Sequence, residues 1–243
     1  MLPANSYNGI LFIDIETVSR YEFFEQADER LKKLFEKKFR KEIELAKEYK
    51  EKDPVQFCWE NNAALHAEFN KIIVICVGAM GADNNFGVKV LASEIESDLL
   101  WSFEKILDKF PSHKLCAHNG KGFDFPVLAK KFIMEGFKLP SQLNVMGKKP
   151  WETPFIDTME MWSFGAFGQK TSLDLLSASL GVPSPKEILH DMSVHEIYYA
   201  NEDKKQEALK LLGEYCTGDV VTLFKVYRKM MGDYSDIDRV VVK

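Results

Sequence analysis

Acidic side chains occur at three widely separated points of the chain where the neighbouring residues suggest chemistry. Asp14 and Glu16 lie in the apolar segment GILFIDIE, and Asp124 follows HNGKGF. Asp219 follows Tyr215 by four residues in EYCTGDVVTLFKVY. Carboxylate oxygens are the ligands that hard divalent cations such as Mg²⁺ prefer. If the fold brings these acids together, they could hold a divalent cation.

The first pair of acids lies in a predicted strand. Because strand residues alternate between faces, Asp14 and Glu16 project to one side and Ile13 and Ile15 to the other. Two neighbouring carboxylates repel each other and lose solvation when buried, so a bound cation would offset the cost. The alternative is that both acids lie solvated at the strand end, with Thr17 capping a following helix.

The other acids also have plain structural alternatives. Asp124 begins a predicted helix, where an acid complements the helix dipole without any further role. Asn119, five residues earlier, could serve only in a turn. Tyr215 and Asp219 are four residues apart and therefore share one helix face, but they could be a boundary aromatic residue and an exposed acid.

Hydrophobic spacing predicts the elements that would position these side chains. We expect strands at residues 9–16, 71–80, 86–93, 114–119 and 154–158, with a turn at GADNN. We expect helices at residues 21–52 (one or two), 94–110, 123–137, 172–181 and 203–231. This order fits an α/β fold with a mixed central sheet, in which parallel strands extend a hairpin and helices cover the faces. Trp151 and Trp162 are interpreted as packing residues.

Composition narrows the class of protein. The 243 residues carry a net charge of −5, which argues against binding nucleic acid through bulk positive charge alone. The start lacks a signal-peptide pattern and no apolar run is long enough to span a membrane, so we expect a cytoplasmic protein without membrane contact. The four cysteines lie far apart, which favours reduced core thiols over a zinc site. Interleaved charges at residues 21–52 favour a solvated helix face over a DNA-binding helix.

Taken together, the three segments resemble a known family. D-I-E-T at Asp14–Thr17, N-x-x-x-F-D at Asn119–Asp124 and Y-x-x-x-D at Tyr215–Asp219 are similar to the three motifs of the DEDD 3′–5′ exonucleases. The tyrosine places the resemblance in the DEDDy subtype, close to the proofreading exonuclease domain of family B DNA polymerases. The resemblance spans nearly the whole chain and implies a single RNase H-like domain over residues 1–243, with a charged helical insertion at about 21–52.

The resemblance also implies roles for individual residues. Asp14, Glu16, Asp124 and Asp219 would be catalytic and would hold two divalent cations, Mg²⁺ or Mn²⁺. Tyr215 would orient the attacking water, since an ordinary phenol pKa near 10 makes it a poor base at neutral pH. Thr17 and Asn119 would contact the substrate, which we expect to be the 3′ end of single-stranded DNA.

Three other readings remain open. The substrate could be RNA or small oligonucleotides, because the sequence contains no clear reader of a 2′-hydroxyl group. The chain could be a non-catalytic nucleic-acid-binding module on the same fold, although such a surface gains nothing from a repulsive acidic cluster. It could also be a structural or interaction protein, which requires the three spaced motifs to be coincidence.

Overall fold

A six-stranded mixed sheet forms the centre of the part of the chain that the computed structural model describes, residues 7–49, 53–81, 85–166, 168–189, 192–200, 202–235 and 239–243. Its order is β5-β4-β1-β2-β3-β6. The strands are β1 (Ile10–Ser19), β2 (Asn70–Met80), β3 (Asn85–Ala92), β4 (Lys114–Ala117), β5 (Ile156–Asp157) and β6 (Arg239–Val242). The first three strands pair antiparallel, whereas β4, β5 and β6 each pair parallel to their neighbour.

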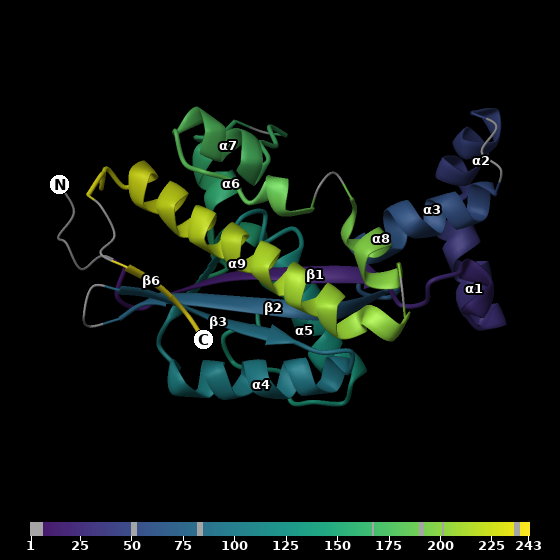
Figure 1. Cartoon of the computed structure of the whole chain (residues 1–243), viewed down its shortest axis with the longest axis horizontal. Coiled ribbons are helices and arrows are strands. Elements are labelled where there is room, and N and C mark those ends of the chain that lie inside the picture. The colour runs from purple at the N-terminus through teal and green to yellow at the C-terminus, as the bar shows by residue number, and fades with distance from the viewer. Residues whose placement is uncertain are drawn as a thin grey trace.

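Helices cover both faces of this sheet, with α8 and α9 on one side and α4 and α5 on the other (Figure 1). The helices are α1 (Glu29–Lys38), α2 (Arg40–Glu48), α3 (Pro54–Asn62), α4 (Glu96–Lys109), α5 (Asp124–Met134), α6 (Thr158–Trp162), α7 (Leu173–Ser179), α8 (Val194–Tyr199) and α9 (Lys205–Met230). Short 3₁₀ helices cover Phe24–Gln26, Ala63–Leu65, Pro150–Glu152, Lys186–Leu189 and Glu202–Lys204. None of the helices described is both long and apolar enough to cross a membrane.

The side chains of β1 divide between the two cores. Leu11, Ile13 and Ile15 are buried against α4 and α5, in the core that also contains Phe103 and Leu128. Phe12 projects to the opposite face, where it packs edge-to-face against Phe224 of α9. The alternation predicted from the sequence therefore holds in β1, and it puts Asp14 and Glu16 on the α9 side of the sheet.

Most predicted elements are confirmed with small shifts at their ends. The predicted helical region at residues 21–52 is two helices, α1 and α2, and residues 50–52 lie outside the described part. Residues 82–84 of the predicted GADNN turn also lie outside it. Apart from the short 3₁₀ helices, four elements were not predicted from the sequence: the helices α3, α6 and α8 and the edge strand β6.

The helices between β1 and β2 have an apolar cluster of their own. Phe35, Phe39 and Trp59 are buried there together with Phe69, and their rings contact one another edge-to-face or tilted. The indole N–H of Trp59 donates to the carbonyl of Tyr21 at 2.8 Å. This buried aromatic cluster explains why helices with so many exposed charged residues fold against the end of the sheet.

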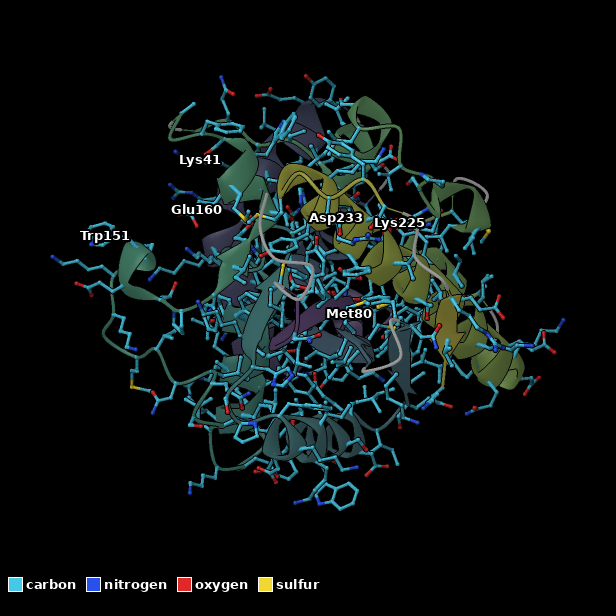
Figure 2. The ribbon with its side chains drawn as sticks, turned by 90° about the vertical axis from the view of Figure 1, so that its left-hand side faces the viewer. Lys41, Met80, Trp151, Glu160, Lys225 and Asp233 are labelled. Atoms are coloured by element: carbon cyan, nitrogen blue, oxygen red, sulfur yellow. The ribbon has the colours of Figure 1, made fainter. Side chains whose placement is uncertain are left out.

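One interpretation of an aromatic residue is wrong. Trp151 was expected to pack, but its side chain is 73% exposed and stands away from the body of the protein on the 3₁₀ turn after α5 (Figure 2). Lys149 places its ammonium group 5.3 Å from the centre of that ring. Hydrophobicity alone could not separate Trp151 from Trp162, which does pack, against a small buried cluster around Leu176.

Gly78 of β2 allows α9 to approach the sheet closely. A Cβ atom at this position would lie 2.3 Å from the ring of Phe86 and 2.7 Å from Cγ1 of Val220. We expect Gly78→Ala to lower the free energy of unfolding by roughly 2–3 kcal/mol, because the ring and helix must move. Urea denaturation measures this, with Gly87→Ala as the control, since a Cβ there would meet only backbone oxygens at 3.9 Å or more. Equal midpoints for the two variants would show that this close approach is not needed.

Candidate functional site

The site begins where β1 runs past its neighbour β4. Cα pairing between the two strands covers Ile10–Phe12, and β4 ends at Ala117. Beyond that point the edge of β1 meets the start of α5 instead of a strand. The buried carboxylate of Asp124, the first residue of α5, accepts a hydrogen bond from the backbone N–H of Ile15. Asp124 is thereby held beside the segment that carries Asp14 and Glu16.

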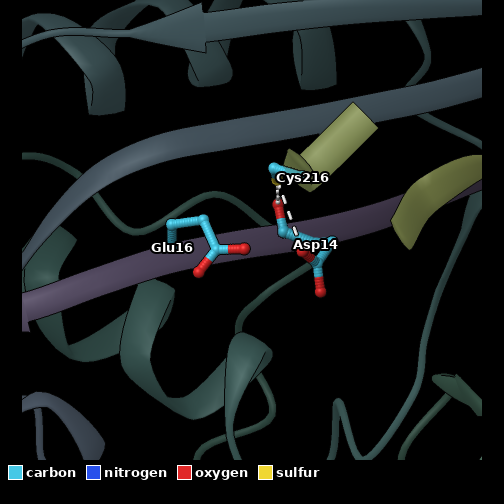
Figure 3. A group of neighbouring side chains, drawn as sticks. All are labelled: Asp14, Glu16 and Cys216. Atoms are coloured by element: carbon cyan, nitrogen blue, oxygen red, sulfur yellow. Dashed lines mark hydrogen bonds between the residues drawn. The ribbon is translucent and has the colours of Figure 1, made fainter. Parts of the chain in front are cut away.

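Helix α9 completes the site from the other side. The thiol of Cys216 donates to Oδ2 of Asp14 at 3.3 Å and to the carbonyl oxygen of Asp14 at 3.5 Å (Figure 3). One ligand atom each from Asp14, Glu16 and Cys216 lie within 4.8 Å of one another. Because Tyr215 precedes Cys216 and Asp219 follows it by three residues, the same helical turn brings both toward β1.

The electrostatics of Asp14 show that the four acids form one cluster. Burial of its carboxyl group raises the pKa of Asp14 well above the ordinary value, and repulsion from Asp219, Glu16 and Asp124 raises it further. The hydrogen bond from Cys216 acts in the opposite direction. Three elements of the fold, β1, α5 and α9, therefore place these four carboxyl groups within electrostatic reach of one another.

The pKa of Asp124 is also raised. The residue is only 3% exposed, and burial raises the pKa of Asp124 to about 7, with a smaller contribution from the nearby carboxylate of Asp157. Hydrogen bonds from its own N–H and from Ile15 N–H partly counter the rise. Such a cluster is costly in its ionised form, and a bound cation is the simplest way to offset that cost.

Tyr215 lies beside these acids and is nearly buried. Burial raises the pKa of Tyr215 above its ordinary range, and the charges of Asp219 and Glu16 and a hydrogen bond with Asp219 add to the effect. The phenol therefore keeps its proton at neutral pH. A protonated hydroxyl can donate to a carboxylate or hold a water molecule, but it cannot accept a proton as a base.

The donor set suits a hard divalent cation. The acids supply carboxylate oxygens, which Mg²⁺ and Mn²⁺ prefer. Burial raises the pKa of the Cys216 thiol well above its usual value, so in the metal-free protein this group keeps its proton and donates to Asp14. Cys216 was predicted only as a core thiol. Its position three residues before Asp219 was the sequence signal for its place at the site.

Both residues expected to contact substrate make hydrogen bonds within the protein, Thr17 through its side chain and Asn119 through its backbone. The Thr17 hydroxyl donates to the carbonyl oxygen of Ala64 at 2.8 Å, which ties β1 to the segment leading into β2. Asn119 adopts a left-handed backbone, with φ of 60°, in the loop between β4 and α5. Its backbone N–H donates to the carboxylate of Asp157. Asp157 was not singled out from the sequence, although its place before the short helix α6 is typical of a capping residue.

Comparisons with known proteins agree with this architecture. A family model described as "predicted 3′–5′ exonuclease related to the exonuclease domain of PolB" matches residues 62–240. The matched region contains Asp124, Tyr215 and Asp219, whereas β1 with Asp14 and Glu16 lies before it. No curated protein sequence matches the chain.

Among solved structures, the family B DNA polymerase of the hyperthermophilic archaeon Pyrobaculum calidifontis is similar, with a TM-score of 0.52 and 15% sequence identity. The similarity covers 91% of this chain and 24% of the polymerase chain, so the chain corresponds to about a quarter of that protein. This structural match confirms the predicted fold class, an RNase H-like mixed sheet with helices on both faces.

Proposed function

Since the chain belongs to the family of predicted 3′–5′ exonucleases related to the exonuclease domain of PolB, we propose that it is a metal-dependent 3′–5′ exonuclease of the DEDDy subtype that acts on single-stranded DNA. The observation that carries the proposal is the convergence of Asp219, Glu16 and Asp124 on Asp14, because the charge of each of the three raises the pKa of Asp14. A protein that only bound a polyanion would gain nothing from four acids at its contact surface.

Asp14, Glu16, Asp124 and Asp219 would hold two divalent cations, Mg²⁺ or Mn²⁺. When bound, the cations supply Lewis acidity for phosphodiester hydrolysis and neutralise charge on the scissile phosphate. The protein contributes the fixed geometry: Ile15 N–H anchors Asp124, and the Cys216 thiol anchors Asp14. Ligands held in this way need little reorganisation when the substrate arrives.

Tyr215 would position the attacking water through its hydroxyl group. Its raised pKa keeps the proton on Oη, so Tyr215 donates to Asp219 or orients water through the oxygen lone pairs, and does not remove the proton from water. Thr17 and Asn119 would contact the terminal nucleotide. Because the Thr17 hydroxyl already donates to Ala64, it would offer the substrate only its oxygen lone pairs.

The substrate is tested with 5′-labelled DNA and RNA oligonucleotides of the same sequence, each incubated with Mn²⁺ or with EDTA. We expect metal-dependent shortening from the 3′ end, faster on DNA than on RNA. Faster degradation of RNA would show that RNA, and not DNA, is the preferred substrate. Tight binding of both strands without degradation in any metal would instead favour a binding module and contradict the proposed activity.

We expect Tyr215→Phe to lower the single-turnover rate by roughly 10- to 100-fold, because the water loses its positioning group while the four acids remain. Mn²⁺ affinity should change little, since the phenol is not one of the proposed ligands. Rapid-quench measurements at saturating enzyme give the rate. A rate equal to that of the wild type would show that the hydroxyl does not act on the water.

A further inference from the structure

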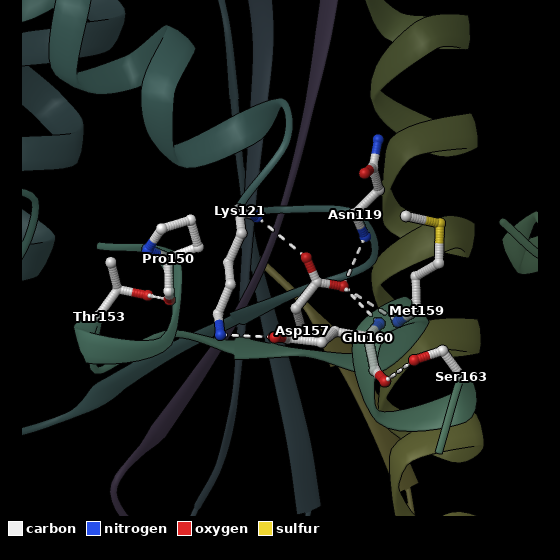
Figure 4. Close-up of polar contacts among 8 residues, drawn as sticks. All are labelled: Asn119, Lys121, Pro150, Thr153, Asp157, Met159, Glu160 and Ser163. Atoms are coloured by element: carbon white, nitrogen blue, oxygen red, sulfur yellow. Dashed lines mark hydrogen bonds and ion pairs between the residues drawn. The ribbon is translucent and has the colours of Figure 1, made fainter. Parts of the chain in front are cut away.

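The carboxylate of Asp157 connects two segments of the chain that lie far apart in sequence. Its Oδ1 accepts from Met159 N–H at 3.0 Å and Glu160 N–H at 3.3 Å, which caps helix α6. The same oxygen accepts from Asn119 N–H at 3.0 Å, and Oδ2 accepts from Lys121 N–H at 3.0 Å (Figure 4). One side chain, 4% exposed, thus satisfies four backbone donors.

The two donors outside α6 belong to the tight loop that leads into Asp124. In this loop Gly122 N–H and Phe123 N–H both donate to the carbonyl oxygen of Asn119. The side chains are tightly packed: a Cβ at Gly120 would lie 2.5 Å from that of Ala117, and one at Gly122 would lie 2.6 Å from Oδ1 of Asn119. The carboxylate of Asp157 therefore fixes the start of a loop that has little freedom to relax.

Further contacts join the same two segments. Thr158, next to Asp157, places its hydroxyl 2.9 Å from Nδ1 of His118. The Lys121 ammonium group pairs with the carboxylate of Glu160 (Figure 4). These contacts lie next to those of Asp157, so residues at the start of α6 bind the segment His118–Lys121 at several points. Thr158 is fully buried as well, but of these three side chains Asp157 is the one that binds the loop through two backbone N–H groups.

We propose that Asp157 is a positioning residue: by clamping the backbone of Asn119 and Lys121 it sets the place of Asp124 and Asn119 in the site. The inference rests on the proposed function, because Asp124 is taken there as a metal ligand. Asp157 itself binds no metal in this account, since its oxygens are occupied by the four N–H donors. Partners that orient ligands in this way commonly change metal affinity or activity about 10- to 100-fold when replaced.

The two carboxylate oxygens of Asp157 allow its binding of the loop to be tested separately from its capping of α6. Asp157→Asn can keep Oδ1, which serves both the cap and Asn119, and loses the acceptor for Lys121 N–H. Asp157→Ser keeps a hydroxyl that caps α6, but it is too short to hold the loop. The matched control is Asp53→Ser. Asp53 is an exposed residue that caps α3 through Val55 N–H and Gln56 N–H, at 3.1 and 3.0 Å.

The test measures kcat and KM on a single-stranded DNA oligonucleotide, the thermal unfolding midpoint, and the Mn²⁺ dissociation constant from the electron paramagnetic resonance signal of free Mn²⁺. We expect kcat to fall in the order wild type, Asp157→Asn, Asp157→Ser, by roughly 10- to 100-fold in the last, with a weaker Mn²⁺ affinity. Asp53→Ser should leave kcat and Mn²⁺ affinity unchanged, and it should shift the unfolding midpoint little because Ser also caps a helix.

Wild-type kcat and Mn²⁺ affinity in both Asp157 variants would overturn the inference and leave Asp157 as a helix cap. If Asp157→Ser does not fold, Asp157→Asn decides by the same two measurements. An inactive wild type would count against the proposed function alone, because the Mn²⁺ dissociation constants still compare the Asp157 variants with Asp53→Ser. The two failures are therefore distinguishable.

Discussion

Asp219→Ala is expected to abolish exonuclease activity while the protein stays folded. Asp219 is the acid that α9 contributes to the cluster, and its charge both raises the pKa of Asp14 and perturbs Tyr215. Removing it deletes one proposed metal ligand and the partner of the Tyr215 hydroxyl. A loss of about 4 kcal/mol of transition-state stabilisation corresponds to roughly 10³-fold in rate.

The fold should tolerate this change, because removing one of the four acids reduces the charge repulsion within the cluster of the metal-free protein. The unfolding midpoint measured in EDTA should therefore equal or exceed that of the wild type. Glu214→Ala is the matched control, since Glu214 is an exposed acid on the same helix and lies outside the cluster. Full activity in a folded Asp219→Ala protein would contradict the assignment. A loss of activity in Glu214→Ala would show that the effect is not specific to the site.

The metal-free protein should become less stable as the pH rises from about 5 to about 8. Asp124 has a folded-state pKa of about 7 against an ordinary value of 3.8, so the folded state binds more protons than the unfolded state between these values. The stability that protonated Asp124 contributes is therefore fully present below its unfolded-state pKa. It is lost as the pH rises through the folded-state pKa. Asp14, whose pKa is also raised, adds to the loss. We expect the unfolding midpoint in EDTA to fall by roughly 5–10 °C.

Thermal unfolding in EDTA and in millimolar Mn²⁺ across this pH range measures the effect. A cation that binds only the folded state should raise the midpoint, and most at the alkaline end where the acids are ionised. Asp124→Asn should flatten the profile in EDTA, because it removes the group that titrates. A midpoint in EDTA that is constant or rises between pH 5 and pH 8 would contradict the electrostatic description of the cluster.

Part of the site followed from local rules of sequence. Alternation in β1 put Asp14 and Glu16 on one face, and the spacing of four residues put Tyr215 and Asp219 on one face of α9. The sequence did not predict that α9 crosses the sheet at Asp14, because this crossing depends on tertiary contacts such as those of Gly78 with Phe86 and Val220. Three separated motifs indicated that these faces meet, but the contacts that join them are tertiary.

Other features lie outside what periodicity can predict. The anchoring of Asp124 to Ile15 N–H requires β4 to end before β1 does. The engagement of Thr17 with Ala64 depends on how the 3₁₀ helix Ala63–Leu65 packs against β1. Helix α3 was missed because its buried residues, Cys58 and Trp59, are adjacent and give no clear helical stripe. These contacts are set by the order of strands in the sheet, which the sequence did not reveal.

The central claim is that the acidic cluster hydrolyses nucleic acid from a 3′ end. The most direct test is gel analysis of a 5′-labelled single-stranded DNA oligonucleotide incubated with Mg²⁺, Mn²⁺ or EDTA, with the wild type beside Asp14→Asn. The account predicts a ladder that shortens from the 3′ end in either metal and is absent in EDTA and in the variant. A ladder of equal strength from the wild type and from folded Asp14→Asn would contradict it.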